Sequence, residues 1–216
     1  FSVLAVAEKG NLLSAPDTYM EKIIIGSNLP NNLLDLDNTV EKNINLLAEA
    51  KNKKPSDLSA CVMKRTRHAN IIKSLDEMKV KINFITDGDI AGGLSVIGNN
   101  PINDIYLSTG GGPEGVIVAA ALSCYGGQMQ GRLILNDDEI IRAEKLGITN
   151  PKKKYNISEI SKGDVIFCAS GVTTGDLAKG IKNFENRFEV TTLALHKSQG
   201  TNKIITNTYK KWTQYP

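Results

Sequence analysis

The sequence predicts an α/β fold from the order in which two periodicities occur. Between residues 60 and 124, runs typical of strands alternate three times with segments of helical spacing, which is the sequence sign of α/β architecture. The last third of the chain adds three more strand-like runs. With 216 residues and a hydrophobic fraction of 41%, the chain has enough apolar side chains to bury a substantial core.

Two strands and one helix are expected before residue 56. The apolar runs at 2–7 and 19–25 are predicted strands, and Gly26 ends the second of them. Residues 38–41, Asn-Thr-Val-Glu, resemble a capping box, and apolar residues keep helical spacing from there to about residue 51.

The alternating region is expected to hold three strand–helix pairs. Apolar residues at 71, 75 and 78 share one helical face, and apolar and polar residues alternate through 80–85. The predicted strands are 60–63, 80–85 and 102–107, and the predicted helices are 67–79, a short one ending near 97, and 114–124. Beyond them we expect a helix at 137–146, a polar linker at 150–162, and strands at 165–169, 190–195 and 203–208.

The chain is expected to divide into two regions. Residues 1–56 would hold the end of an N-terminal sheet region with a connecting helix, and residues 57–216 an α/β domain with the ligand-binding loops. Phe1 opens directly on an apolar strand, which is unusual for a native start. We therefore interpret the chain as a piece of a longer protein whose N-terminal part is missing here.

Composition excludes several classes of partner. A net charge of +3 is too small to indicate nucleic acid binding. No run approaches the length of a membrane span, and no signal peptide is visible. The odd number of cysteines, Cys61, Cys124 and Cys168, and their apolar neighbours predict reduced core thiols in a cytoplasmic protein.

A glycine loop at 108–115, Ser-Thr-Gly-Gly-Gly-Pro-Glu-Gly, lies between a predicted strand and a predicted helix. Glycines let backbone N–H groups approach an anion closely, and a helix N-terminus adds positive charge there. Glu114 would repel a phosphate unless a cation lay between them. The loop therefore suggests a metal-assisted phosphate site.

Three polar clusters follow successive predicted strands, namely Arg65–His68, Asp87–Asp89, and Gly110–Gly112 with Glu114. Ligands of open α/β sheets bind outside the carboxyl ends of the strands, so these loops are expected to converge on one sugar-phosphate site. Each cluster also has a simpler interpretation: a basic strand exit, an ordinary turn, and a carboxylate at a helix N-terminus. The glycine loop lacks the ending of a P-loop and does not match the dinucleotide fingerprint.

At these residues the sequence resembles the class II fructose-1,6-bisphosphatases of bacteria, along nearly all of its length and over the C-terminal two-thirds of that family's pattern. The stretches that carry the resemblance are Leu4–Val6 with Ala15–Lys22, Arg67-His68, Asp87–Asp89, Gly111–Val116 with Met129–Leu133, and Val165–Phe167 with Ser170–Leu177.

The resemblance implies a layered sugar-phosphatase fold with mixed sheets flanked by helices. It implies hydrolysis of the 1-phosphate of fructose 1,6-bisphosphate to fructose 6-phosphate in gluconeogenesis, with Mn²⁺ or Mg²⁺, by a cytoplasmic homo-oligomer, either a dimer or a tetramer. By position, Glu114 matches a catalytic metal ligand of the family. The positions that match substrate-binding residues are Tyr19, Arg65, Thr66, Arg67, Asp87, Gly88, Asp89 and Gly111.

The chain departs from the family pattern in two places that bear on function. Thr66 stands where the family has proline. The family's upstream acidic metal ligands are absent from this sequence, and one carboxylate cannot hold a divalent cation, so the chain by itself is expected to be inactive. Alternatives are a phosphatase for sedoheptulose 1,7-bisphosphate or another sugar phosphate, a non-catalytic sugar-phosphate-binding module, and a nucleotide-binding module.

Overall fold

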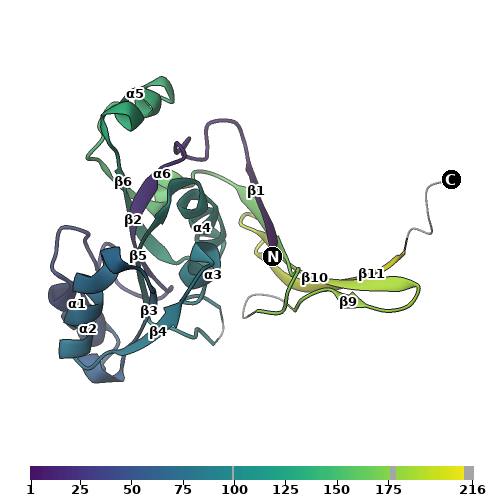
Figure 1. The fold of residues 1–216 in the computed structure, drawn as a ribbon, viewed down its shortest axis with the longest axis horizontal. Helices are drawn as coiled ribbons and strands as arrows, with labels where there is room; N and C mark the ends of the chain where they lie inside the picture. Colours follow the sequence, from purple (N-terminus) through teal and green to yellow (C-terminus); the bar gives the residue numbers. More distant parts are fainter. Residues whose placement is uncertain (99, 176–178, 212–216) are drawn as a thin grey trace.

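The computed structural model describes residues 1–98, 100–175 and 179–211. These residues form a six-stranded mixed sheet and a five-stranded sheet, with helices packed against them (Figure 1). The predicted α/β class, with mixed sheets flanked by helices, is confirmed. Among the described residues, every helix is too short or too polar to cross a lipid bilayer.

The six-stranded sheet brings together the loops that the sequence analysis singled out. Its strand order is β4-β3-β5-β2-β6-β7. The strands are β2 (Tyr19–Ile25), β3 (Ser59–Met63), β4 (Lys81–Ile85), β5 (Ile105–Gly111), β6 (Gln128–Ile134) and β7 (Lys154–Asn156). β3 runs parallel to β4 and β5, whereas β2 is antiparallel to β5. The carboxyl ends of β3, β4 and β5 and the start of β2 therefore lie at the same end of the sheet.

The five-stranded sheet consists of β1 (Ser2–Ala7), β8 (Val165–Ser170), β10 (Arg187–His196), β11 (Thr201–Lys210) and the short β9 (Lys182–Asn183). Helix α4 (Gly112–Tyr125) lies between the two sheets (Figure 1), and its side chains share one core with β8 and β10. Helices α1 (Val40–Ala50) and α2 (Ala69–Glu77) cover the other face of the six-stranded sheet and enclose a second core.

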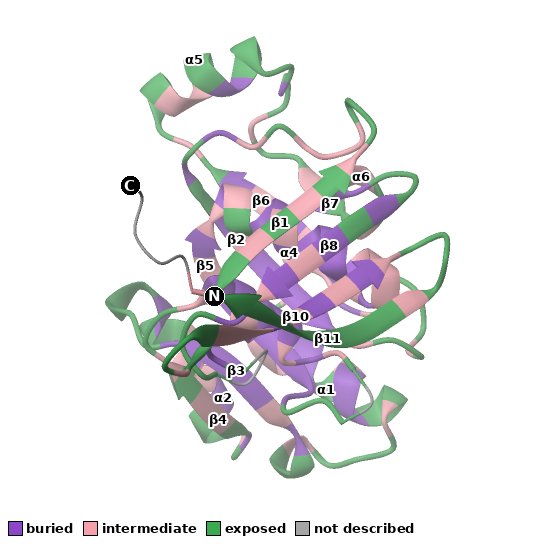
Figure 2. Cartoon of the chain, turned by 90° about the vertical axis from the view of Figure 1, so that its right-hand side faces the viewer, coloured by how far each residue is buried: buried purple, intermediate pink, exposed green. Residues whose placement is uncertain are grey.

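One face of the five-stranded sheet is not covered by any described residue (Figure 2). Leu4 and Val6 of β1 are 50% and 53% exposed, and Ile166 of β8 is 39% exposed. These side chains point outward because strands alternate their faces, and the inward-facing Phe167 is fully buried. The result is an apolar patch on the outer surface.

Several predicted elements differ from the structure. The capping box at 38–41 is wrong: Thr39 is the N-cap and accepts from the N–H of Lys42, so no glutamate occupies the reciprocal position. The strand predicted at 80–85 is present as β4, but it lies at the edge of the sheet and its Phe84 is 48% exposed. The segment 150–162 is no linker, since it contains β7 and helix α6 (Ile157–Ile160).

Other boundaries shift by a few residues or were not foreseen. Strand β5 continues to Gly111, so the glycine loop is partly strand and α4 begins at Gly112. The predicted helix at 67–79 starts with a 3₁₀ turn at Thr66–His68. The remaining helices are α3 (Asp89–Leu94), α5 (Asp137–Lys145) and a 3₁₀ turn at Pro55–Asp57. The proposed division at residue 56 stays a prediction.

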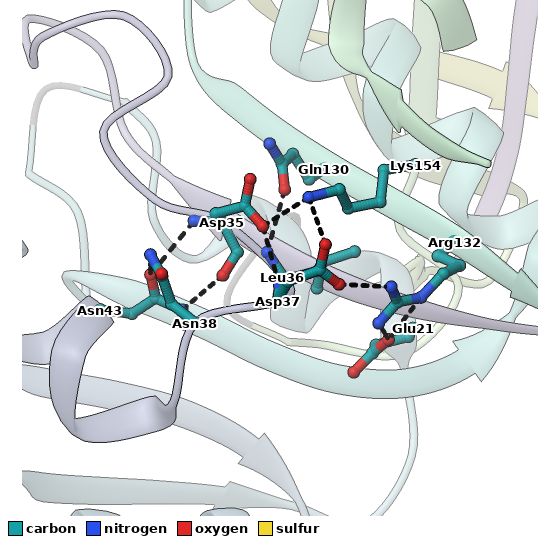
Figure 3. Close-up of polar contacts among 9 residues, drawn as sticks. All are labelled: Glu21, Asp35, Leu36, Asp37, Asn38, Asn43, Gln130, Arg132 and Lys154. Carbon is teal, nitrogen blue, oxygen red and sulfur yellow. Dashed lines mark hydrogen bonds and ion pairs between the residues drawn. The ribbon is translucent and has the colours of Figure 1, made fainter. Parts of the chain in front are cut away.

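A network of charged side chains fixes the loop before α1 against β6 and β7 (Figure 3). Arg132 of β6 binds Glu21 at 2.7 Å and Asp37 at 2.6 Å. Lys154 of β7 binds Asp35 at 2.6 Å and Asp37 at 2.7 Å. Hydrogen bonds from Lys154 hold the pKa values of Asp35 and Asp37 below the ordinary 3.8 and raise the pKa of Lys154 above 10.5.

We expect Lys154→Met to lower Tm at neutral pH by an amount that shrinks in acid. A carboxyl whose pKa is lower in the folded state stabilises the fold above its unfolded pKa, and that contribution is lost as pH falls through the folded pKa. The stabilisation by the two ionised carboxylates should therefore be lost as the pH falls below 3.8. Melting curves of the wild type and the variant between about pH 3 and pH 7 measure it.

The control for this experiment is Lys145→Met, which removes a lysine of α5 that forms no ion pair with the described residues. Its effect on Tm should not depend on pH in this range. If Lys154→Met lowered Tm as much at low pH as at neutral pH, this result would contradict the role of the two carboxylates.

Candidate active site

A pocket of about 500 Å³ lies at the end of the six-stranded sheet where β3, β4 and β5 finish. It is lined by Phe1, Tyr19, Met63, Arg65, Arg67, Asp87, Gly88, Asp89, Ile90, Gly110, Gly111 and Glu114. Eight of the nine predicted site residues are in this list, and only Thr66 is not. Another cavity, of about 380 Å³, has no charged side chain in its lining. The charged groups therefore select the first pocket as the candidate site.

Arg67 is held at the pocket by two contacts. Its Nε donates to the carbonyl oxygen of Thr109 at 2.8 Å, and its guanidinium lies over the ring of Tyr19, 4.7 Å from the ring centroid. Tyr19 begins β2 and pairs with Gly111 of β5. The Nε contact leaves the terminal nitrogens of the guanidinium directed at no described partner, so they can grip an anion.

The 3₁₀ turn that carries Arg67 depends on His68, which is fully buried. The N–H of Thr109 donates to Nε2 of His68 at 2.8 Å, so Nε2 is the acceptor nitrogen. Nδ1 then carries the hydrogen and donates to the carbonyl oxygen of Met63 at 2.7 Å. The neutral ring thus ties the end of β3 to β5. From the sequence alone, His68 is predicted only as part of the Arg67-His68 motif.

The loop after β4 presents one exposed and one buried aspartate. Asp87 is exposed and accepts from the N–H of Gly88 at 2.8 Å. Gly88 has φ of 90°, a left-handed conformation that favours glycine. Asp89 begins α3 and is only 9% exposed, so its carboxylate points beneath the pocket rather than across its opening.

Two buried residues that the sequence analysis did not select bind Asp89. Lys22 of β2 and Tyr106 of β5 are both fully buried, and each donates to a different oxygen of the Asp89 carboxylate. Burial lowers the pKa of Lys22, against the opposing effect of Asp89, and burial together with Asp89 raises the pKa of Tyr106. A lysine within the strand predicted at 19–25 was a signal that could have revealed Lys22 but not Tyr106.

Glu114 lies in the first turn of α4, exposed and next to Gly111. The helix N-terminus offers fewer free N–H groups than the sequence predicted. The N–H of Gly112 donates to the carbonyl oxygen of Thr18 at 2.7 Å, and Pro113 has none. Anion binding here would rest mainly on side chains and a cation rather than on a backbone nest.

The pocket offers part of the oxygen donor set that Mn²⁺ or Mg²⁺ requires. Glu114 is an exposed carboxylate of the hard-oxygen type that both ions prefer. No group of three or more His, Cys, Asp and Glu side chains that could hold a metal occurs among the described residues. Glu114 fits as one ligand of such an ion, but this chain's described part does not form a complete site.

Fold and pocket together define an α/β protein whose strand ends gather guanidiniums and carboxylates around one pocket. The family model described as bacterial fructose-1,6-bisphosphatase, glpX-encoded, matches residues 1–209. The chain therefore belongs to this family. Residues Asp176 and Leu177 of the last motif lie outside the described residues.

Curated relatives support the same assignment. A protein of Synechococcus sp. strain JA-3-3Ab, named D-fructose 1,6-bisphosphatase class 2/sedoheptulose 1,7-bisphosphatase, is 36% identical over 100% of this chain and 66% of its own length. A Synechocystis protein of the same name is 31% identical over 97% of this chain and 65% of its own length. The chain thus spans slightly less than two thirds of these relatives.

Proposed function

We propose that this chain carries the sugar-bisphosphate pocket of a phosphatase that hydrolyses the 1-phosphate of fructose 1,6-bisphosphate, giving fructose 6-phosphate and phosphate in gluconeogenesis. The observation that supports this most strongly is the gathering of Arg65, Arg67, Asp87 and Glu114 around one pocket in a member of this family. Guanidiniums and carboxylates that line the same pocket suit a doubly charged sugar with free hydroxyls.

In this proposal each group has one task. Arg65 and Arg67 hold the distal 6-phosphate, which does not react. Asp87 accepts hydrogen bonds from sugar hydroxyls. The remaining predicted contacts, which stay predictions, are Tyr19, Thr66, Gly88, Asp89 and Gly111. Binding energy from the distal phosphate favours a bisphosphate over a monophosphate.

Glu114 would hold Mn²⁺ or Mg²⁺ from the α4 side of the pocket. Such an ion supplies charge neutralisation on the phosphoryl group. We place its other ligands in the third of the family's length that this chain does not span. The apolar face formed by Leu4, Val6 and Ile166 is where we expect that part of the enzyme to pack. A cytoplasmic homo-oligomer, dimer or tetramer, remains part of the proposal.

We expect the 216-residue chain with Mn²⁺ and fructose 1,6-bisphosphate to release no phosphate above the background rate, because Glu114 cannot hold the ion by itself. A phosphate-release assay measures this. Metal-dependent turnover by this chain would contradict the division of ligands proposed above.

Arg67→Ala should weaken the binding of fructose 1,6-bisphosphate to the chain by about tenfold to a hundredfold, because a charge-assisted contact to phosphate is lost. Isothermal titration calorimetry measures the affinity. The matched control is Arg187→Ala, since Arg187 also lies over an aromatic ring, that of Phe184, but does not line the pocket. Equal affinities of the wild type and Arg67→Ala would refute the phosphate contact.

The relatives' names also contain sedoheptulose 1,7-bisphosphate, which carries its two phosphates on a longer sugar. The same titration with both bisphosphates separates the two substrates. Preference for the seven-carbon sugar would transfer the proposal to that substrate without changing the roles of Arg67 and Glu114.

A further inference from the structure

A buried polar unit lies directly beneath the pocket and connects two of its loops. The Nζ of Lys22 donates to the carboxylate of Asp89 and, at 2.8 Å, to the carbonyl oxygen of Gly111. Tyr106 donates to the second oxygen of the same carboxylate. Lys22 and Tyr106 are both fully buried and Asp89 is 9% exposed, so Asp89 is the member of this unit that lines the pocket.

The surrounding backbone is shaped to admit the unit. A Cβ at Gly110 would lie 2.6 Å from Oδ2 of Asp89, and a Cβ at Gly92 would lie 2.7 Å from the ring of Tyr106. Both distances are too short for any side chain. Glycine at 110 and 92 therefore permits the close approach of Asp89 and Tyr106, which shows how tightly the unit fits.

Through this unit, two ligand-carrying loops, the turn between β4 and α3 and the junction of β5 with α4, are joined to one side chain. Asp89 begins α3 directly after the turn that carries Asp87, and Gly111 ends β5 directly before the helix that carries Glu114. The peptide group between Gly111 and Gly112 is held at both ends, since its carbonyl accepts from Lys22 and its N–H donates to Thr18. Its orientation is therefore determined from within the core.

We propose that Lys22, with Asp89 and Tyr106, is a positioning residue that sets the separation of the two ligand-carrying loops. This inference rests on the proposed function, because the loops are the ones assigned to the sugar bisphosphate. A buried ion pair gives little net stability, since desolvation offsets its attraction, but removal of one partner leaves an uncompensated charge. Loss of Lys22 should therefore disturb the loops that Asp89 and Gly111 belong to.

The experiment compares Lys22→Met, Tyr106→Phe and the control Lys51→Met in the 216-residue chain. Lys51 forms an ion pair with Asp104, which precedes β5 and so lies at the end of that strand away from the pocket. Two quantities are measured: the calorimetric affinity for fructose 1,6-bisphosphate, and the amide NMR resonances of Gly111 and Glu114 without ligand. The resonances report loop position, which a change in overall stability alone would leave in place.

Lys22→Met is expected to shift both resonances and to weaken binding of the bisphosphate at least about tenfold. Tyr106→Phe loses one hydrogen bond and should weaken the same binding by about threefold to tenfold. Lys51→Met should change neither quantity. If Lys22→Met does not fold, Tyr106→Phe decides the outcome by the same two measurements.

The failures of the two proposals are distinguishable. Wild-type affinity and unshifted resonances in the folded variants, with normal binding by the wild type, would overturn the positioning role alone. Absence of any binding by the wild-type chain would overturn the proposed function, and the positioning role with it.

Discussion

Glu114→Gln is expected to reduce hydrolysis of fructose 1,6-bisphosphate by at least about a hundredfold, a loss typical of removing one electrostatic contact to the reacting group. Glu114 is exposed in the first turn of α4, so glutamine fits without rearrangement, and only the negative charge is removed. The assay uses an enzyme that joins this chain to the rest of the family's length. The affinity for Mn²⁺ should fall together with turnover.

The control for Glu114→Gln is Glu77→Gln, which neutralises an exposed carboxylate of α2 that pairs with Lys73. It should leave turnover and Mn²⁺ affinity unchanged. Turnover by Glu114→Gln equal to that of the wild type would show that Glu114 is no ligand. Binding of the bisphosphate to the isolated chain without metal should be at least as tight in Glu114→Gln as in the wild type, because without an ion the carboxylate of Glu114 only repels the phosphate.

His68→Ala is expected to lower the free energy of unfolding by about 3–5 kcal/mol, because it leaves a cavity, one backbone N–H without its partner and one carbonyl oxygen that keeps only its bond from the N–H of Arg65. These groups are the N–H of Thr109 and the carbonyl oxygen of Met63. Chemical denaturation followed by circular dichroism measures the change. The carbonyl oxygen of Thr109 also accepts from Arg67, so binding of the bisphosphate should weaken as well.

The chain contains two histidines, and the second provides the control. His196 is half-buried and binds Asp164 at 2.8 Å. Hydrogen bonds from Ser198 and then from His196 hold the pKa of Asp164 below its ordinary value. His196→Ala should lower the free energy of unfolding much less than His68→Ala, because solvent can replace an exposed contact. Comparable losses in the two variants would argue against the central role of the two backbone hydrogen bonds of His68.

Most of the candidate site could be predicted because its residues follow the predicted strands directly. Arg67, Asp87 and Glu114 come after β3, β4 and β5, and parallel strands place their carboxyl ends at the same end of the sheet. Lys22 and Tyr106 could not be assigned in this way. They lie within strands, and only the pairing of β2 with β5 and the position of α3 bring them together on Asp89.

By itself the sequence determined most of the segments that become strands or helices and which turns carry charge, because periodicity, glycine and proline act over a few neighbouring residues. The order of the strands was decided only in the tertiary structure. The unforeseen β6 places β2 in the interior of the sheet, segment 150–162 adds β7 to its edge, and Phe84 stays exposed on the other edge. Pairing and burial depend on contacts between residues far apart in the chain, and local patterns do not contain that information.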